Sequence, residues 1–279
     1  MAVVGGLAWG AVTIPPTAPK PERVPHVVLT PVSQTVAAAP APVAKPPEGP
    51  PLAPASLFDP AIFVAAPPPG PGAGTAFSVS DQGVWLTARH VVEGCGRTVI
   101  VTAPGQGVAA EAKILPGKET ALLFTNGGAP ALPIAPIASL RRGQAVWHPG
   151  FPQTRPGEAA SDLMRRANLW VGWRGLRAQP VLVFRETARS PAMHGSLTGL
   201  SGAPALDGKG RVIGVTVAEN PRRRRLYATT PSSLRSVLAE AKVTAADSGG
   251  EAMTTSTWKS ASDDLRASLS IAEVECLAR

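Results

Sequence analysis

Short apolar runs separated by glycine and proline dominate the chain from about Leu57 onward. Each run holds four to six β-branched or apolar residues between turn-forming residues, a pattern typical of β-strands. No amphipathic helical pattern lies between them, so the strands are expected to form an antiparallel all-β barrel or sandwich. The eight runs are Gly74–Val79, Val84–Thr87, Thr98–Thr102, Ala121–Phe124, Ala145–Trp147, Val181–Phe184, Val212–Val217 and Leu226–Thr229.

Two helices are predicted after the last of these runs. Pro231–Glu240 begins with proline and serine and places its apolar side chains on one face, as a helix does. Residues 244–261 are small and polar and are expected to form a linker. Asp263–Cys276 carries apolar residues at helical spacing, which predicts a short C-terminal helix.

The first quarter of the chain differs in composition, because 18 of the 31 prolines lie in the first 72 residues. Residues 15–56 are rich in proline and alanine and bury too little apolar surface to offset the entropy lost on ordering, so a disordered linker is expected. Residues 1–14 resemble the apolar part of a secretory signal or anchor but lack its basic start. An upstream start codon or a cytoplasmic protein would each explain this. The sequence thus predicts a folded domain over residues 57–243, followed by a linker and short helix over residues 244–279.

The net charge is +8, and much of the basic excess lies in short arginine groups such as Arg141–Arg142, Arg165–Arg166 and Arg222–Arg225. Surfaces that bind nucleic acid usually interleave such charges with aromatic residues or lay them along a helix, and neither pattern occurs here. No specific nucleic-acid partner is therefore expected. No apolar stretch reaches the ~18 residues that a membrane-spanning helix needs. A polytopic membrane protein is excluded, while an N-terminal membrane tether stays open.

Cys95 and Cys276 are the only cysteines and lie far apart, which excludes a CxxC redox motif and a zinc ribbon. A long-range disulfide in an oxidising compartment and two buried thiols are both open at this point. The histidines form no metal-binding motif, and no phosphate or dinucleotide motif is present. Neither a metal nor a cofactor is expected.

Two segments carry candidate chemistry. Thr87-Ala88-Arg89-His90 places a histidine at the end of a predicted strand, and Gly199-Leu200-Ser201-Gly202-Ala203-Pro204 places a serine in a turn between glycines. A hydroxyl nucleophile needs an adjacent general base. The glycines let backbone N–H groups converge on one point, as an oxyanion hole requires. The two segments together suit acyl transfer.

At these residues the chain resembles the chymotrypsin/trypsin-like serine peptidases, and among them the compact bacterial HtrA-like branch without a PDZ domain. The first segment matches the family's Thr-Ala-x-His motif, and the second its Gly-x-Ser-Gly-Gly-Pro motif with Ala203 at the last glycine. The resemblance covers about residues 70–240 and implies a double six-stranded β-barrel with a C-terminal helix. It also implies that His90 is the general base, Ser201 the nucleophile, and the N–H groups of Gly199 and Ser201 the oxyanion hole.

The acid that orients the histidine departs from the family's pattern. The family's Asp-Leu-Ala-Leu-Leu strand corresponds here to Glu119-Thr120-Ala121-Leu122-Leu123, which begins 29 residues after His90 and 82 before Ser201. Glutamate can accept the imidazole N–H, but its extra methylene displaces the carboxylate by roughly 1–1.5 Å, enough for positioning to affect the rate. We expect Glu119 to complete a Ser-His-Glu triad. A surface glutamate beside a degenerate triad is the alternative.

The resemblance also implies where the substrate pocket lies. Its floor corresponds to Gly195, and one wall to Thr216, Val217 and Ala218. None of these carries a carboxylate, which implies cleavage after small or aliphatic residues rather than after lysine or arginine. Arg222–Arg225 follow in the next loop, either as a solvated hairpin tip or as a surface that selects acidic segments.

The sequence therefore predicts a serine endopeptidase that acts on protein or peptide substrates and is exported, for example to a bacterial periplasm. The alternative is an inactive pseudopeptidase of the same fold that binds a peptide or an acidic partner. Because Cys95 lies five residues after His90, a disulfide to Cys276 would tie the C-terminal segment beside the active site, and export would permit it. The oligomeric state is not predicted.

Overall fold

A computed structural model describes residues 49–65, 69–137, 140–171, 178–191, 193–246 and 250–278. These residues belong to the second of two compact units, Pro46–Arg279. The predicted signal or anchor of residues 1–14 and most of the predicted linker of residues 15–56 lie outside the described residues.

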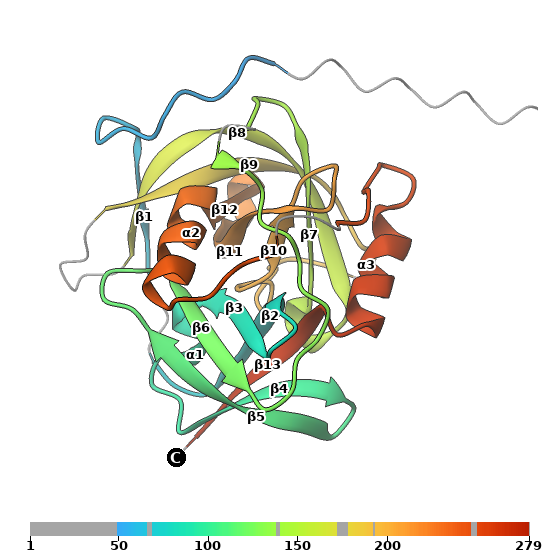
Figure 1. The fold of residues 1–279 in the computed structure, drawn as a ribbon. Coiled ribbons are helices and arrows are strands. Elements are labelled where there is room, and N and C mark those ends of the chain that lie inside the picture. The colour runs from blue at the N-terminus through green and yellow to red at the C-terminus, as the bar shows by residue number, and fades with distance from the viewer. Residues whose placement is uncertain are drawn as a thin grey trace, which may run out of the picture. The chain divides into compact units, whose positions relative to one another are not determined.

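The described chain is mostly β-sheet (Figure 1). Its strands are β1 (Ala61–Val64), β2 (Gly72–Ser80), β3 (Val84–Ala88), β4 (Arg97–Ala103), β5 (Gln106–Ile114), β6 (Thr120–Thr125), β7 (Ala145–Gly150), β8 (Gly157–Val171), β9 (Gln179–Arg189), β10 (Pro204–Leu206), β11 (Val212–Asn220), β12 (Arg225–Thr229) and β13 (Ile271–Leu277). Its helices are α1 (Arg89–Val92), α2 (Pro231–Glu240) and α3 (Trp258–Ala267), with 3-10 turns η2 (Pro152–Thr154) and η3 (Pro221–Arg223). All eight predicted strands and the helix at Pro231–Glu240 are confirmed.

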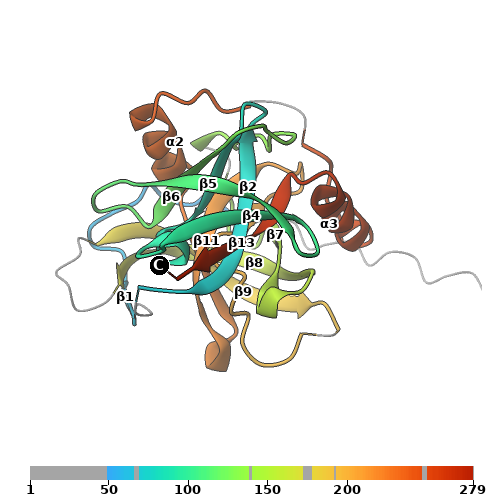
Figure 2. The same cartoon turned by 90° about the horizontal axis from the view of Figure 1, so that it is seen from below.

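The first barrel is closed and has the strand order β13-β2-β3-β6-β5-β4. Its last strand comes from the far end of the sequence: β13 pairs antiparallel with β2 on one side and with β4 on the other. Seen from below, β13 lies beside β2 and β4 (Figure 2). The alternation of Val274 and Cys276 inward with Glu275 outward suits this half-buried strand. Without β13, β2 and β4 would each present an open edge.

The second barrel is built from consecutive strands. The order β8-β7-β10-β11-β12-β9 is closed by antiparallel pairing of β9 with β8, and β1 adds a parallel strand outside β8. Together the two barrels confirm the predicted double six-stranded β-barrel, with α2 as the helix that follows the second barrel.

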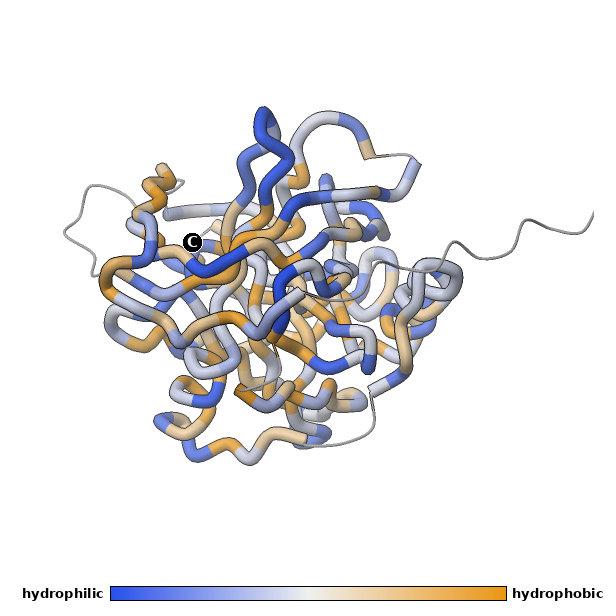
Figure 3. Tube along the Cα trace, turned by 90° about the horizontal axis from the view of Figure 1, so that it is seen from above, coloured by the Kyte–Doolittle hydropathy of each residue, from blue (hydrophilic) through white to orange (hydrophobic). Residues whose placement is uncertain are grey.

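Two apolar clusters hold the fold together. The larger one joins first-barrel side chains such as Phe77 and Leu122 to side chains of α2 and of strands in the second barrel. The smaller one, which includes Leu163 and Phe184, belongs to the second barrel and its loops. Along the trace, many apolar stretches run through the interior, and strongly hydrophilic ones lie at outer turns (Figure 3). The barrels therefore pack against each other through a shared core.

The N-terminal boundary of the folded part differs from the prediction. Residues 49–56 were expected to be disordered but pack on the second barrel, where the N–H of Leu52 donates to the carbonyl of Leu140 at 2.9 Å. The Nε of Arg166 also donates to the carbonyl of Ala53 at 2.7 Å. These backbone partners lie far away in the sequence, so local composition did not reveal them.

The C-terminal segment also differs from the prediction. The helix begins at Trp258, inside the predicted linker, and ends at Ala267 rather than running to Cys276. Leu269 has a φ of 61°, which ends the helical path, and β13 follows at Ile271. The segment packs tightly, because Ile271, Val274 and Cys276 are each at most 2% exposed.

A disulfide joins Cys95 to Cys276 across 181 residues, as predicted. It links β13 to the chain that leaves α1. In the part of the chain that the structure describes, no helix is long and apolar enough to cross a membrane.

Candidate active site

His90 is placed by the end of β3 and the start of α1. β3 pairs with β6 so that Ala88 lies opposite Thr120, and the N–H of Arg89 donates to the carbonyl of Glu119 at 2.8 Å. These contacts turn the chain at the strand end and bring the histidine to the edge of the first barrel. The Thr-Ala-x-His segment is thus a strand end followed by one helical turn.

Ser201 lies in a tight turn before β10 of the second barrel. Gly199 and Gly202 have φ values of +96° and +92°, which L side chains rarely adopt. A Cβ at Gly202 would also clash with the backbone carbonyl of Thr75 in β2. The N–H of Thr75 donates to the carbonyl of Ser201 at 2.8 Å, so the serine turn is held directly against the first barrel.

His90 and Ser201 line one cavity of about 400 Å³. Gly199, Thr216, Val217 and Ala218 line it as well, so most of the residues assigned from the sequence come together. The other lining residues are Val64, Ala65, Gly70, Pro71, Gly72, Ala73, Val91, Val171, Leu197, Thr198, Leu200, Glu219 and Leu226.

The backbone around Ser201 leaves two donors available. The N–H of Leu200 is used by the carbonyl of Leu197 at 2.8 Å, and that of Gly202 by the carbonyl of Thr216 at 2.7 Å. Among the described residues, none accepts a hydrogen bond from the N–H of Gly199 or Ser201. Both residues line the cavity, where these N–H groups can bind an oxyanion.

Glu119 lies just before β6 and is 4% exposed. Its own N–H is held by Oε1 of Gln179 at 3.1 Å, and its carbonyl by Arg89. Burial raises the pKa of the Glu119 carboxyl, and the charge of Arg89 opposes that shift. Glu119 is therefore a buried carboxyl beside the strand end that carries His90, rather than a surface glutamate.

Burial lowers the pKa of His90 to about 4, against the opposing influence of Glu93. The imidazole is then neutral at pH 7 and able to accept a proton. Within the described part of the chain, no hydrogen bond joins His90 to Ser201 or to the Glu119 carboxyl. The three side chains are brought to the same region without the contacts of an assembled triad.

The pocket differs in detail from the one that the resemblance implies. Gly195 is not among the described residues that line the cavity, and its carbonyl accepts a hydrogen bond from Nη1 of Arg189 at 2.8 Å. Glu219 does line the cavity, and its Oε1 accepts from the N–H of Leu197 at 2.8 Å. Sequence reasoning missed Glu219 as a site residue, although its position three residues after Thr216 on the same strand could have indicated it.

The arginine loop lies between β11 and β12. Arg222, Arg223 and Arg224 are exposed, and Nη2 of Arg224 lies 3.5 Å from Oε1 of Glu186. Among the residues that the structure describes, no group of three or more His, Cys, Asp or Glu side chains is arranged to hold a metal ion.

Two closed barrels with a histidine from one and a serine from the other define a trypsin-like peptidase. A model of the trypsin-like peptidase domain matches residues 74–215, and the chain belongs to this family. The family assignment made from the two motifs is confirmed. No curated protein is similar enough in sequence to match.

Solved structures of similar fold include the HtrA-type protease AlgW with a decapeptide, at a TM-score of 0.50 and 18% identity over 61% of this chain and 51% of AlgW. The chain therefore spans about half the length of AlgW. The Rv3671c protease of M. tuberculosis H37Rv, in an inactive form, has a TM-score of 0.50 and 21% identity over 60% of this chain and 82% of that protein. At these identities the likeness concerns the fold.

Proposed function

We propose that the protein is a serine endopeptidase in which Ser201 attacks the scissile carbonyl and His90 takes its proton as general base. The observation that carries this proposal is that both side chains line one cavity in a trypsin-like double barrel. The low pKa of His90 supports the role, because a neutral imidazole is the form that accepts the proton. The same histidine then donates the proton to the leaving amine.

The N–H groups of Gly199 and Ser201 are proposed to hold the oxyanion of the tetrahedral intermediate. Neither N–H has an acceptor among the described residues, and both residues line the cavity. Such fixed backbone donors need no reorganisation when negative charge develops.

Glu119 is the proposed acid of the triad. Its buried position beside the turn that carries His90 allows its carboxylate to accept the imidazole N–H once substrate is bound. Catalytic hydrogen bonds often tighten only in the substrate complex. In the ionised form Glu119 would fix the imidazole tautomer and stabilise the imidazolium.

The substrate is proposed to be a protein or peptide that places a small or aliphatic side chain in the cavity. Leu197, Val217, Ala218 and Leu226 give the cavity an apolar lining. The solved HtrA-type relative with a bound decapeptide supports a peptide ligand.

A second candidate is a pseudopeptidase that binds peptide without cleaving it. It is favoured by one observation: in the described residues His90 is hydrogen-bonded neither to Ser201 nor to the Glu119 carboxyl. The exposed arginines of the β11–β12 loop would then serve to bind an acidic segment of the partner.

A fluorophosphonate probe distinguishes the two candidates, because it labels a serine only where a base and an oxyanion hole activate it. We expect stoichiometric labelling of wild type, no labelling of Ser201→Ala, and strong loss of labelling in His90→Ala. Failure of folded wild type to react, together with retained peptide binding, would favour the pseudopeptidase.

We further propose that the protein is exported to an oxidising compartment such as a periplasm. The Cys95–Cys276 disulfide supports this location, since such bonds persist where thiols are not kept reduced. Alkylation of unreduced protein from its native host should detect no free thiol. Two free thiols per chain would contradict export.

A further inference from the structure

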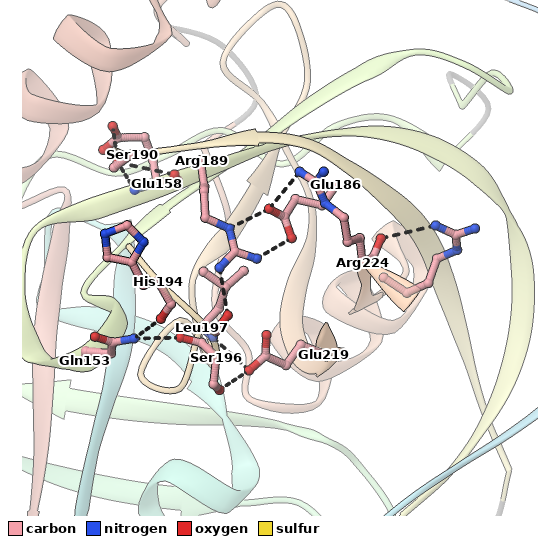
Figure 4. Close-up of polar contacts among 12 residues, drawn as sticks. Gln153, Glu158, Glu186, Arg189, Ser190, His194, Ser196, Leu197, Glu219 and Arg224 are labelled. Atoms are coloured by element: carbon pink, nitrogen blue, oxygen red, sulfur yellow. Dashed lines mark hydrogen bonds and ion pairs between the residues drawn. The ribbon is translucent and has the colours of Figure 1, made fainter. Parts of the chain in front are cut away.

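The segment between His194 and Thr198 leads directly into the turn that carries Gly199 and Ser201. Its backbone is held by side chains from three other elements, shown together in Figure 4. Gln153 comes from η2, Arg189 from the end of β9 and Glu219 from β11. Each contact spans distant parts of the fold or the two sides of one loop, so the segment depends on them for its shape.

Arg189 holds the middle of the segment. Its Nη1 donates to the carbonyl of Gly195 at 2.8 Å. Its Nε and Nη2 donate to the two carboxylate oxygens of Glu186, each at 2.6 Å, and the Glu186 side chain is only 2% exposed. A bidentate pair of this kind fixes the guanidinium plane. Arg189 is therefore a rigid donor rather than a mobile surface arginine.

Glu219 holds the next two residues. Its Oε1 accepts hydrogen bonds from the N–H of Leu197 and from the hydroxyl of Ser196. One carboxylate oxygen thus binds both a backbone and a side-chain donor. The charge of Glu219 also contributes to the raised pKa of Arg189, after the larger effect of Glu186, so the two holding residues lie within each other's field.

Gln153 fastens the segment from the opposite side. Its Nε2 donates to the carbonyls of His194 and Ser196, both at 2.9 Å, and its N–H donates to the carbonyl of Thr198 at 2.6 Å. To make these contacts Gln153 adopts a φ of +54°, which costs free energy for a residue with a side chain.

The shape of this segment is passed on to the oxyanion donors. The carbonyl of Leu197 accepts from the N–H of Leu200 at 2.8 Å, which sets the turn that contains Gly199 and Ser201. On the other side of the turn, Oγ1 of Thr75 donates to the carbonyl of Gly199 at 2.8 Å. Because the carbonyls are used in this way, the N–H groups of Gly199 and Ser201 stay available to the cavity.

We propose that Arg189 and Glu219 are positioning residues of the peptidase site: they hold Gly195 and Leu197 so that the Gly199–Ser201 turn presents its two N–H groups to the substrate. Neither residue touches the reacting atoms. The catalytic part of this inference rests on the proposed function, while the holding of the loop does not.

Two pairs of variants test the proposal. Glu219→Ala removes the acceptor, whereas Glu219→Gln keeps an oxygen for Leu197 and removes only the charge. Arg189→Met removes the donor to Gly195, and Arg185→Met is its matched control. Arg185 lies on the same strand and pairs with a carboxylate, Asp162, but its side chain is 59% exposed and contacts no residue of the held segment.

Hydrogen exchange is the first readout and needs no activity. We expect amides of residues 195–201 to exchange at least about tenfold faster in Glu219→Ala and Arg189→Met, because this segment opens locally. Glu219→Gln should retain most of the protection, and Arg185→Met should match wild type. Unchanged exchange of residues 195–201 in both disrupting variants, or a rise spread evenly over both barrels, would overturn the proposal.

Steady-state kinetics on a peptide substrate is the second readout. Misplacing an oxyanion donor lowers kcat, so we expect about a 10- to 100-fold loss in Glu219→Ala and Arg189→Met with a smaller change in KM. Glu219→Gln should recover at least a third of that loss on a logarithmic scale. Wild-type kcat in a variant with a loosened segment would refute the positioning role, whereas an inactive wild type would refute the proposed function and leave the exchange result to decide on the loop.

Discussion

The two barrels are similar in strand number but differ in how the chain builds them. The second barrel uses consecutive strands, from β7 to β12, and can close as soon as that part of the chain folds. The first barrel uses β2 to β6 and then waits for β13, which lies beyond the whole second barrel in the sequence. The first barrel is therefore the one whose closure depends on a distant segment and on the disulfide that ties it.

This difference matters because the proposed triad is divided between the barrels. His90 and Glu119 belong to the first barrel and Ser201 to the second. Arg266 in α3 pairs with Glu158 of β8 at 2.9 Å, and both side chains are less than 10% exposed. The C-terminal segment thus docks α3 on the second barrel and completes the first barrel with β13. It acts as a brace between the two halves of the site.

The largest expected effect tests the contribution of the first barrel to catalysis. Glu119→Gln removes the charge that orients His90 and should lower kcat/KM by up to about 10⁴, because a wrongly held imidazole tautomer costs that much. Glu119→Asp restores the family's usual acid and should keep or raise activity. Peptide hydrolysis with matched circular dichroism spectra checks both variants.

Equal activity of wild type and Glu119→Gln would remove Glu119 from the mechanism. The first barrel would then supply His90 alone, and the charge of Glu93, which acts on the pKa of His90, would be the next candidate for variation.

The next effect tests the closure of the first barrel. On the chain-entropy model, a cross-link that closes a loop of about 180 residues contributes roughly 4–5 kcal/mol, an upper figure because strain and residual structure reduce it. We expect dithiothreitol to lower the free energy of unfolding of wild type and to raise hydrogen exchange in β2, β4 and β13 more than in β7–β12. The Cys95→Ser/Cys276→Ser variant is the control and should not respond to the reductant. An equal rise in both barrels would contradict the special role of β13.

Much of this architecture could be predicted from the sequence, but the missing strand of the first barrel could not. The eight predicted strands are short apolar runs, and tertiary packing agrees with their local preference. β13 was predicted as helix because residues from Leu265 to Ala272 have helical spacing, and that pattern breaks at Leu269. The alternation of Val274 and Cys276 with glutamates indicates a strand. Nothing local says that its partner is β2.

The same limit applies to the site. His90, Ser201 and the wall from Thr216 to Ala218 stand in recognisable motifs, and the structure brings them to one cavity. Arg189 and Gln153 bind backbone carbonyls, which carry no sequence signal. Glu219 looked like the start of the arginine loop. Side chains that act through backbone contacts between distant segments are visible only once the fold is known.

A smaller effect compares the buried histidines of the two barrels. In the second barrel His148 is fully buried, bonded to Oγ1 of Thr216 at 2.9 Å and to Oγ of Ser161 at 2.8 Å, and burial lowers its pKa to about 3. The unfolded state binds the proton near pH 6.5 and the folded state only near pH 3. Stability is therefore complete above pH 6.5 and falls by about 1.4 kcal/mol per pH unit below it.

Urea unfolding between pH 7 and pH 4 measures this slope. His148→Gln cannot titrate, so its slope should be flatter than that of wild type, although it is less stable at pH 7. His90→Asn should flatten the slope as well, since the pKa of His90 is also lowered, to about 4. Parallel slopes in wild type and His148→Gln would show that His148 does not titrate with unfolding.

The smallest expected effect concerns which barrel selects the substrate. The second barrel supplies the apolar lining from Leu197, Val217 and Leu226, while the first supplies mainly glycine and alanine from residues 70–73. Peptides with Ala, Val or Leu before the scissile bond should be cleaved with a kcat/KM about 10–200-fold above those with Lys or Arg, the range that pocket fit usually provides. The opposing feature is Glu219, whose carboxylate lines the same cavity. Because its Oε1 is already bound by Leu197 and Ser196, we expect it to hold the loop rather than attract a basic side chain. A preference for Lys or Arg that disappears in Glu219→Gln would contradict this and make Glu219, not Gly195, the residue that defines the pocket.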